Sequence, residues 1–309
     1  MPRVNPLETL TQINLDDLVT SFGWQDHRIL SGALRRIFFP AAKKFSKQML
    51  DFDDAVGARG LADAARLSLR RYVRGVRIFD ADRIPAFAFL ALSNHPGMTD
   101  TLALCAALNR ADLKIIALNR PFLLSLSNIS RQLFYVTDNP HEQINLVRRV
   151  SGHLRAGGAA LTFPAGHIEP DPDVYSGAVD SLKDWTDSVG VFIRLAPETA
   201  ILPVLVRGVI WDQTAHHPIV KLKKIKEERE KLAAALQLLA MVVFNAKPVT
   251  VTVQIGRPIT VKELGSTDPQ IIHQAVLKEM EILIREGAPH ADKILPVEKN
   301  KSIWPDSLV

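Results

Sequence analysis

The sequence predicts an α/β fold in which a mixed β-sheet is flanked by helices and preceded by a helical N-terminal region. Beyond residue 74, short apolar segments alternate with segments of helical periodicity, which is typical of a layered α/β fold. The 309 residues, 47% of them hydrophobic, are enough for one large domain with an appendage. We therefore expect an amphipathic helical region over residues 1–74, an α/β domain over 75–288 and a loosely packed tail over 289–309.

Two amphipathic helices are predicted in the N-terminal region. Apolar residues recur at helical spacing from Leu30 to Phe52 and again from Leu61 to Val73, so each helix has one apolar stripe. The remaining surface is strongly basic, with Arg28, Arg35, Arg36, Lys43, Lys44, Lys47, Arg59, Arg66, Arg70, Arg71, Arg74 and Arg77. Such a face either is solvated or docks on an acidic partner, and the pattern alone leaves both open.

A strand that runs into a turn and then a helix is predicted around His95. Phe87–Leu92 is apolar and typical of a buried strand, and Pro96–Gly97 suits the middle of a type II turn. Helical spacing follows, with Thr99 or Asp100 as the N-cap. In an open α/β sheet such a point borders the ligand crevice. A carboxylate there would fix one imidazole nitrogen and leave the other basic, which suits a base that activates a hydroxyl of the substrate.

The rest of the chain continues the alternation. Further strands are expected at Leu113–Ala117, Gln132–Val136, Ala159–Phe163, Ile201–Val206 and Val249–Ile255. Helices are expected at Gln143–Leu154, across Ala178, Leu182, Trp185, Val189 and Phe192, at Lys226–Phe244, and at Pro269–Arg285 with Asp268 as its cap.

Three segments together resemble the glycerolipid acyltransferase superfamily, which acylates glycerol-3-phosphate and lysophospholipids. The family's block N-H-x-x-x-x-D, also called HX4D, is matched by Asn94, His95 and Asp100. Its block F-P-E-G-T-R is matched by Phe163, Pro164 and Gly166, and its apolar strand around a proline by Ile201-Leu202-Pro203-Val204-Leu205-Val206-Arg207-Gly208. The blocks occur in the family's order, and the resemblance covers roughly Val73 to Pro258.

The sequence departs from the family's pattern where the acceptor phosphate is held. Ala165 stands at the usual glutamate, and His167-Ile168 at the usual threonine-arginine, whose arginine helps hold that phosphate in the family. The segment 131–141 is more similar to the soluble plastid-type glycerol-3-phosphate acyltransferases, and by that analogy His141 falls at a phosphate-contacting histidine, with Pro140 at the lysine before it. The expected substrate-binding residues are Arg120, Arg131, His141, Pro164, Gly166 and His167.

The resemblance implies an O-acyltransferase that moves a fatty acyl group from acyl-CoA or an acyl-carrier protein to a hydroxyl of glycerol-3-phosphate or a lysophospholipid. His95 would deprotonate that hydroxyl, Asp100 would orient His95, and backbone N–H groups near Gly166 could stabilise the oxyanion. No cofactor or metal is required beyond the acyl donor. Two alternatives stay open, an acyl-thioester hydrolase and a non-catalytic lipid-binding member of the same fold. The spacing His167-x-Glu169-x-Asp171-x-Asp173 could also supply metal ligands, although an acidic loop is usually solvated.

The charge and cysteine content restrict partners and compartment. A net charge of +5 and a pI near 9.3 favour anionic partners, either an anionic membrane surface or an acidic acyl-carrier protein. Nucleic acid is not expected, since no nucleic-acid-binding module is recognisable. A single cysteine, Cys105, excludes an internal disulfide and suggests a reducing compartment. Because the start lacks a signal pattern and no apolar run approaches the roughly 20 residues of a membrane span, we expect a cytoplasmic, peripherally membrane-associated protein.

Overall fold

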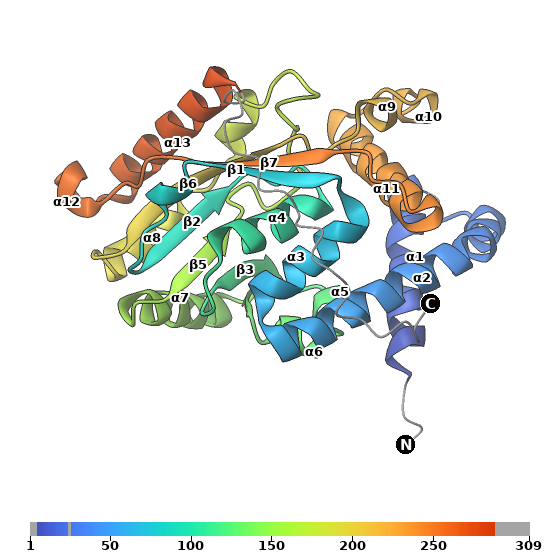
Figure 1. Cartoon of the computed structure of the whole chain (residues 1–309), viewed down its shortest axis with the longest axis horizontal. Coiled ribbons are helices and arrows are strands. Elements are labelled where there is room, and N and C mark those ends of the chain that lie inside the picture. Colours follow the sequence, from blue (N-terminus) through green and yellow to red (C-terminus); the bar gives the residue numbers. More distant parts are fainter. Residues whose placement is uncertain (1–4, 24–25, 288–309) are drawn as a thin grey trace, which may run out of the picture.

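The computed structural model describes residues 5–23 and 26–287, and within them it contains a mixed seven-stranded sheet flanked by helices (Figure 1). This confirms the predicted fold class. The strands are β1 Gly75–Phe79, β2 Phe89–Ser93, β3 Lys114–Leu118, β4 Leu133–Val136, β5 Ala159–Thr162, β6 Ala200–Arg207 and β7 Thr250–Ile255, in the order β1-β7-β6-β2-β5-β3-β4. Only the β6–β7 pair is antiparallel among these strands, so β2, β3, β4, β5 and β6 all end at one edge of the sheet.

Helices cover both faces of the sheet. They are α1 Pro6–Phe22, α2 Arg28–Arg59, α3 Leu61–Tyr72, α4 Met98–Leu108, α5 Pro121–Leu124, α6 Ser127–Ser130, α7 Pro140–Arg155, α8 Ser188–Leu195, α9 Asp212–Ala215, α10 Pro218–Lys221, α11 Lys226–Phe244, α12 Val261–Leu264 and α13 Pro269–Glu286. Strand β2 lies in the middle and is buried along its whole length. Phe89 and Ala91 point into the core shared with α3 and α4, whereas Leu90 and Leu92 point into the core shared with α7, α8 and α13.

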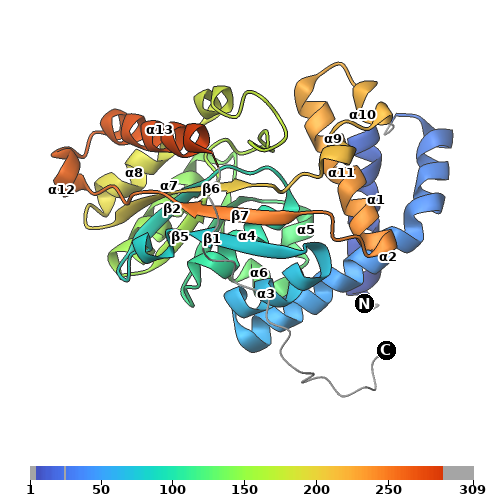
Figure 2. The ribbon, with the colours of Figure 1, turned by 45° about the horizontal axis from the view of Figure 1, so that its top comes forward.

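The N-terminal helices pack against the same core as the sheet. Leu10 of α1 and Met49 and Phe52 of α2 belong to one apolar cluster with α3, α4 and the sheet. The buried Asp53 carboxylate of α2 accepts the N–H groups of Asn128, at 2.9 Å, and Ile129, at 2.7 Å, and so fixes the start of α6. Helices α1, α2 and α11 lie side by side at one end of the molecule (Figure 2).

The six strands predicted from the sequence are all present, but other elements differ. Strand β1 was not predicted, and α1 lies in the expected helical region over residues 1–74, although no separate helix was predicted there. The helix expected across residues 178–192 is wrong, because that segment forms a short 3₁₀ helix, Asp180–Asp184, followed by α8. Between them Trp185 is extended, with φ −69° and ψ 128°, and its indole N–H donates to Glu169 at 2.7 Å. The apolar residues of this segment still face one core, which explains their helix-like spacing.

Two further expectations concern the ends of the chain and the membrane. The C-terminal tail over 289–309 lies outside the described residues. Within the described residues, no helix is both long and apolar enough to cross a membrane.

Candidate active site

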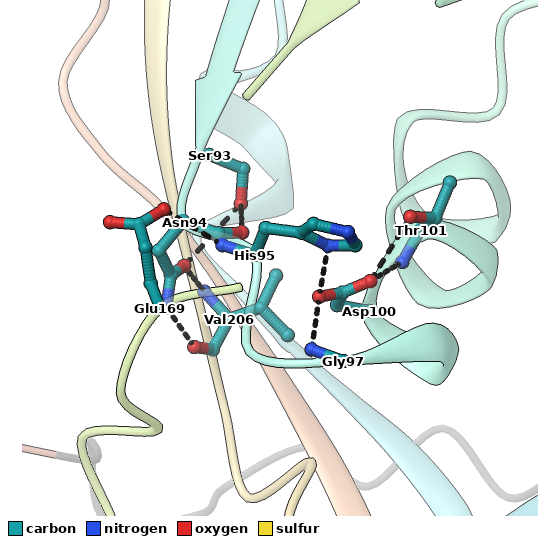
Figure 3. Close-up of polar contacts among 8 residues, drawn as sticks. All are labelled: Ser93, Asn94, His95, Gly97, Asp100, Thr101, Glu169 and Val206. Carbon is teal, nitrogen blue, oxygen red and sulfur yellow. Dashed lines mark hydrogen bonds and ion pairs between the residues drawn. The ribbon is translucent and has the colours of Figure 1, made fainter. Parts of the chain in front are cut away.

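The loop that follows β2 is locked to the neighbouring strand β6 by one side chain. The amide of Asn94 donates to the carbonyl oxygen of Val206 at 2.8 Å, and its side-chain oxygen accepts the N–H of Val206 at 2.8 Å (Figure 3). Asn94 thus replaces a strand residue in the ladder and satisfies a buried backbone pair. The chain leaves the sheet immediately afterwards, at His95.

His95 and Asp100 form a close side-chain pair. Nδ1 of His95 lies 2.8 Å from Oδ2 of Asp100, whose side chain is completely buried. The same Oδ2 accepts the N–H of Gly97 at 2.8 Å, and Oδ1 accepts the backbone N–H of Thr101 and its hydroxyl at 3.0 Å. A carboxylate can only accept hydrogen bonds, so the ring nitrogen that faces Asp100 must be a donor. Nδ1 is therefore the protonated nitrogen of a neutral His95.

The start of α4 differs in two details from the expectation. Gly97 has φ 170° and ψ −159°, so Pro96–Gly97 is not the centre of a type II turn, which requires a positive φ at its second position. Gly97 itself is the N-cap, and Asp100 occupies the third helical position and accepts the N-cap N–H. The predicted cap at Thr99 or Asp100 is therefore wrong, because the carboxylate reaches back to the cap instead of forming it.

A second carboxylate holds the backbone of His95. Glu169, in the segment after β5, accepts the N–H of His95 at 3.0 Å and donates its own N–H to the carbonyl oxygen of His95 at 2.9 Å. Its other oxygen accepts the indole N–H of Trp185 at 2.7 Å and the hydroxyl of Ser181 at 3.4 Å. Burial raises the pKa of Glu169 to about 7, although these hydrogen bonds and the nearby His95 lower it.

Asp171 in the same segment anchors the loop after β6. Its buried carboxylate accepts the N–H groups of Gly208 at 3.0 Å, Val209 at 2.6 Å and Ile210 at 2.8 Å. The carboxylate oxygens of Glu169 and Asp171 thus accept hydrogen bonds from donors of the protein itself. Among the described residues no group of three or more His, Cys, Asp or Glu side chains is arranged to hold a metal ion.

The second ring nitrogen of His95, Nε2, carries the lone pair that can accept a proton. No described group hydrogen-bonds to Nε2, and 31% of the side chain is exposed. The ring lies against Phe163, with 4.7 Å between ring centroids. Burial lowers the pKa of His95, but the Asp100 charge and hydrogen bond and the Glu169 charge outweigh burial, so the pKa lies above 6.5. The imidazole is thus a stronger base than an isolated histidine.

The three expected phosphate-binding residues lie in different places. Arg120 follows β3 at the carboxyl edge of the sheet, is exposed, and its charge acts on both His95 and Asp17. His141 lies at the start of α7, also beyond a carboxyl strand end, but β4 is three strand spacings of about 4.8 Å from β2. Arg131 precedes β4, and its carbonyl oxygen accepts a hydrogen bond from Lys114, the first residue of β3. It therefore lies at the opposite edge of the sheet, and the structure does not bring it to His95.

The expected residues of the second loop form a turn beside Phe163. The N–H of Gly166 donates to the carbonyl oxygen of Phe163 at 3.0 Å, so that N–H is not available to an oxyanion in this conformation. Pro164 is buried, and its carbonyl oxygen accepts the N–H of Thr186 at 3.2 Å. The imidazole of His167 bonds to the carbonyl oxygen of Ala165 at 2.8 Å. This loop therefore shapes the site mainly through Phe163, which touches the His95 ring.

An apolar cavity of about 300 Å³ adjoins the start of α4. Its lining includes Met98, three residues after His95, and Phe122, two residues after Arg120. The other lining residues are Asn14, Asp17, Leu18, Ser21, Phe38, Ala41, Ala42, Phe45, Met49, Ala235, Leu238, Leu239 and Val242. Helices α1, α2 and α11 thus line most of a largely apolar space, which also reaches Met98, two residues before Asp100.

Cys105 is not a competing nucleophile. Its side chain is 2% exposed within α4, and burial raises the pKa of its thiol to about 12. Within the described residues, no hydroxyl or thiol hydrogen-bonds to the ring of His95. A nucleophile for this base therefore has to come from a substrate or from water.

Sequence reasoning missed two parts of the site. Glu169 was considered only as a metal ligand, and its role in holding His95 has no local signal because the two residues are far apart in sequence. The cavity also could not be foreseen, since it is assembled from five separate helices, mainly α1, α2 and α11. Asn94 was noted as a block residue, and the structure adds its bonds to Val206.

Comparison with known proteins gives little independent information. No protein family matches the sequence. No curated protein matches it either. Among solved structures, the 1-acyl-sn-glycerophosphate acyltransferase of Thermotoga maritima is 15% identical, with a TM-score of 0.44 over 92% of this chain and 95% of that chain. Similarity at this level does not assign a function.

Proposed function

We propose that this protein is an acyltransferase of the glycerolipid type. It moves a fatty acyl group from a thioester, acyl-CoA or an acyl-carrier protein, to a hydroxyl of glycerol-3-phosphate or a lysophospholipid. The observation that carries the proposal is the buried Asp100 carboxylate bonded to Nδ1 of His95, with Nε2 left for a substrate. The sequence blocks that contain these two residues support the same superfamily.

The geometry suits direct attack by the acceptor. The acceptor hydroxyl gives its proton to Nε2 of His95 while its oxygen bonds to the thioester carbonyl carbon. The tetrahedral intermediate then breaks its C–S bond, and the leaving thiolate takes the proton back from the imidazolium. Asp100 holds the ring in the required tautomer and stabilises the imidazolium between these steps. An ester and a thiol result, with no acyl group attached to the protein.

The apolar cavity is the proposed site for the acyl chain. Met98, which lines the cavity, is the first residue of α4 and follows the His95-Pro96-Gly97 segment, so a chain that ends there would bring its carbonyl group toward His95. Burying a methylene group is worth about 0.8 kcal/mol, so a largely apolar lining favours a fatty acyl chain.

Arg120 is the proposed partner of the acceptor phosphate. It is exposed at the same sheet edge as His95, and its charge acts on the imidazole. A guanidinium binds phosphate by charge-assisted hydrogen bonds, which fits an anionic glycerol acceptor. His141 remains a more distant proposal for the same phosphate.

A labelled long-chain acyl-CoA tests the function directly. It is incubated with the protein and with glycerol-3-phosphate, lysophosphatidic acid or no acceptor, and the lipid products are separated. We expect labelled ester only when an acceptor is present. Release of free fatty acid at the same rate in all three mixtures would favour a thioester hydrolase. The three mixtures are repeated with acyl-carrier protein as the donor, and the absence of product with both donors would contradict the proposal.

A further inference from the structure

We propose that one end of the molecule docks on an anionic phospholipid bilayer and that a groove leads from it to the acyl cavity. The docking surface consists of Ile29, Leu30, Ile37, Ile219, Leu222 and Ile225, with Arg28, Arg36, Lys221, Lys224 and Lys226 around them. The docking itself is independent of the proposed function, whereas the role of the groove rests on the proposed acyl transfer.

The apolar residues of the docking surface are unusually exposed. Ile29 is 88% exposed, Leu222 80% and Ile37 69%, and the other three are also on the exposed side. Single exposed aliphatic residues are common, but a cluster of them is typical of an interaction site. These side chains come from α2, α10 and the segment that joins α10 to α11.

The members of the docking surface lie together although they are far apart in sequence. An open apolar groove of about 350 Å³ is lined by Leu30, Ala33, Leu34, Ile37, Phe38, Ile219 and Leu236, so α2 meets α10 and α11 there. A Cβ atom on Gly23, just after α1, would lie 3.3 Å from Nζ of Lys223. The start of α2 and the segment 219–226 therefore occupy one end of the molecule, where α10 and α11 are drawn in Figure 2.

Basic side chains surround this apolar cluster. Arg28, Arg36, Lys221, Lys224 and Lys226 are exposed, against the exposed acids Asp26 and Glu228, of which Glu228 pairs with Lys223 at 3.3 Å. The other basic residues of α2 are partly used within the protein, since Arg35 pairs with Asp16 and Nζ of Lys44 lies 3.0 Å from Oδ1 of Asn245. The basic surface thus differs from the one that the sequence alone suggested.

A bilayer fits both features at once. Exposed aliphatic side chains insert below the headgroups of a lipid layer, and lysine and arginine beside them contact anionic headgroups. An acidic carrier protein would match the lysines, whereas the strong exposure of Ile29 and Leu222 fits insertion into a lipid layer. We therefore choose the bilayer as the occupant and treat the carrier protein as an outcome of the test.

The open groove and the cavity proposed for the acyl chain adjoin each other along α2 and α11. Phe38 lines both the open groove and the acyl cavity. On α11, Leu236 faces the groove, and the adjacent Ala235 and Leu239 face the cavity. Since Met98 also lines the cavity, the proposed path of a lipid chain runs from the groove past Phe38 to the start of α4.

Vesicle flotation tests the docking without any substrate. Wild type and variants are mixed with vesicles of phosphatidylcholine, with or without phosphatidylglycerol. The apolar variant is Leu222→Ser with Ile225→Ser, and the charge variant is Lys221→Gln with Lys224→Gln; all four residues are exposed, so folding should not suffer. The matched controls are Ile271→Ser with Ile282→Ser and Lys262→Gln with Lys278→Gln, on α12 and α13 at the other end of the molecule (Figure 1).

We expect wild type and both controls to float with the anionic vesicles and both test variants to be lost from them. Each lysine near such a surface is worth about 1 kcal/mol, so the charge variant should bind roughly 30-fold more weakly. Equal binding of test variants and controls, no binding of wild type, or binding only to an acyl-carrier protein would overturn the proposal. Vesicle binding without acyl transfer would instead overturn the proposed function and leave the docking intact.

A bulky residue in the open groove tests the path. Ala33→Trp should slow transfer to a lysophospholipid presented in vesicles at least several-fold, while transfer to soluble glycerol-3-phosphate from a water-soluble short-chain acyl-CoA stays unchanged. Vesicle binding should also stay unchanged, because this variant keeps every apolar and basic residue of the docking surface. Equal rates with both substrate pairs would show that the groove is not the path.

Discussion

Glu169 and His95 are joined by two hydrogen bonds that run in opposite directions. The carboxylate of Glu169 accepts the His95 N–H at 3.0 Å, and the Glu169 N–H donates to the His95 carbonyl oxygen at 2.9 Å. Asp100 holds the ring of the same histidine at 2.8 Å. Two carboxylates that follow different strands thus fix His95: Glu169 holds its backbone, and Asp100 holds its ring. A catalytic base needs preorganisation of this kind.

Replacing Glu169 should affect the rate more than substrate binding. Glu169→Gln keeps the size of the side chain but offers one acceptor oxygen where two are used, so either the His95 N–H or the Trp185 indole loses its partner. We expect kcat to fall about tenfold with little change in KM, because the ring shifts while the substrate contacts remain. An unchanged kcat would show that Asp100 alone positions His95.

The same variant should change how stability depends on pH. Burial raises the pKa of Glu169 from 4.5 to about 7, so between these values the folded protein holds more protons than the unfolded chain, and stability falls as the pH rises. The amide introduced by Glu169→Gln does not titrate, so the variant lacks this decline. The difference in melting temperature, wild type minus Glu169→Gln, should therefore decrease from pH 4.5 to 7. A constant difference would contradict the raised pKa.

Asp100→Asn should reduce both activity and stability. Asparagine can accept only at its carbonyl oxygen, whereas the carboxylate serves the His95 ring, Gly97 and Thr101. The loss of buried charged hydrogen bonds costs about 1.5–3 kcal/mol each, and loss of base positioning costs roughly 10²–10⁴ in rate. Steady-state kinetics and thermal unfolding at one pH measure both. Retained activity at a lowered melting temperature would leave Asp100 a purely structural residue.

Arg120→Gln should weaken the binding of a phosphorylated acceptor. We expect KM for glycerol-3-phosphate to rise roughly 10- to 100-fold, since a charge-assisted hydrogen bond is lost, with KM for the thioester unchanged. The acid limb of the kcat/KM profile reports the pKa of His95. The Arg120 charge lowers this pKa, so its removal in Arg120→Gln should move the acid limb to higher pH. Arg131→Gln, at the other sheet edge, is the matched control and should behave as wild type. The same KM effect in both variants would point to a nonspecific charge effect.

A larger residue in the acyl cavity should shorten the preferred acyl chain. Ala41→Phe fills part of the cavity, so long chains lose contacts worth about 0.8 kcal/mol per methylene group. The ratio of kcat/KM for long-chain over short-chain acyl-CoA should fall at least tenfold. Ala58→Phe, an exposed position on the same helix, should leave that ratio unchanged. An unchanged ratio in Ala41→Phe would place the chain elsewhere.

The sequence was most informative where spacing is local. The apolar runs located every strand except β1, in which only Val76 is buried, so that its periodicity is weak. His95 and Asp100 lie in one strand–turn–helix unit, and their pairing could be predicted from it. The helix predicted over 178–192 was wrong because the apolar residues of this segment face one core from two short helices. Trp185 lies between these helices and donates to Glu169.

Long-range contacts explain what the sequence could not show. Arg131 is near the expected motif in sequence, but the chain enters β4 after it, so the parallel pairing of β3 and β4 carries it to the far edge. The contact of Glu169 with His95 and the cavity between α1, α2 and α11 depend on how β5 and α11 are placed beside β2 and α2, which no local pattern encodes.

The transfer rate of a His95→Ala variant tests the central claim most directly. The measurement is single-turnover transfer from labelled acyl-CoA to the acceptor that wild type uses best, with the melting temperature measured alongside. Loss of a general base predicts a rate roughly 10²–10⁴ lower than wild type in a protein that is still folded. A folded His95→Ala protein that transfers the acyl group at the wild-type rate would contradict the assignment of His95 as the base.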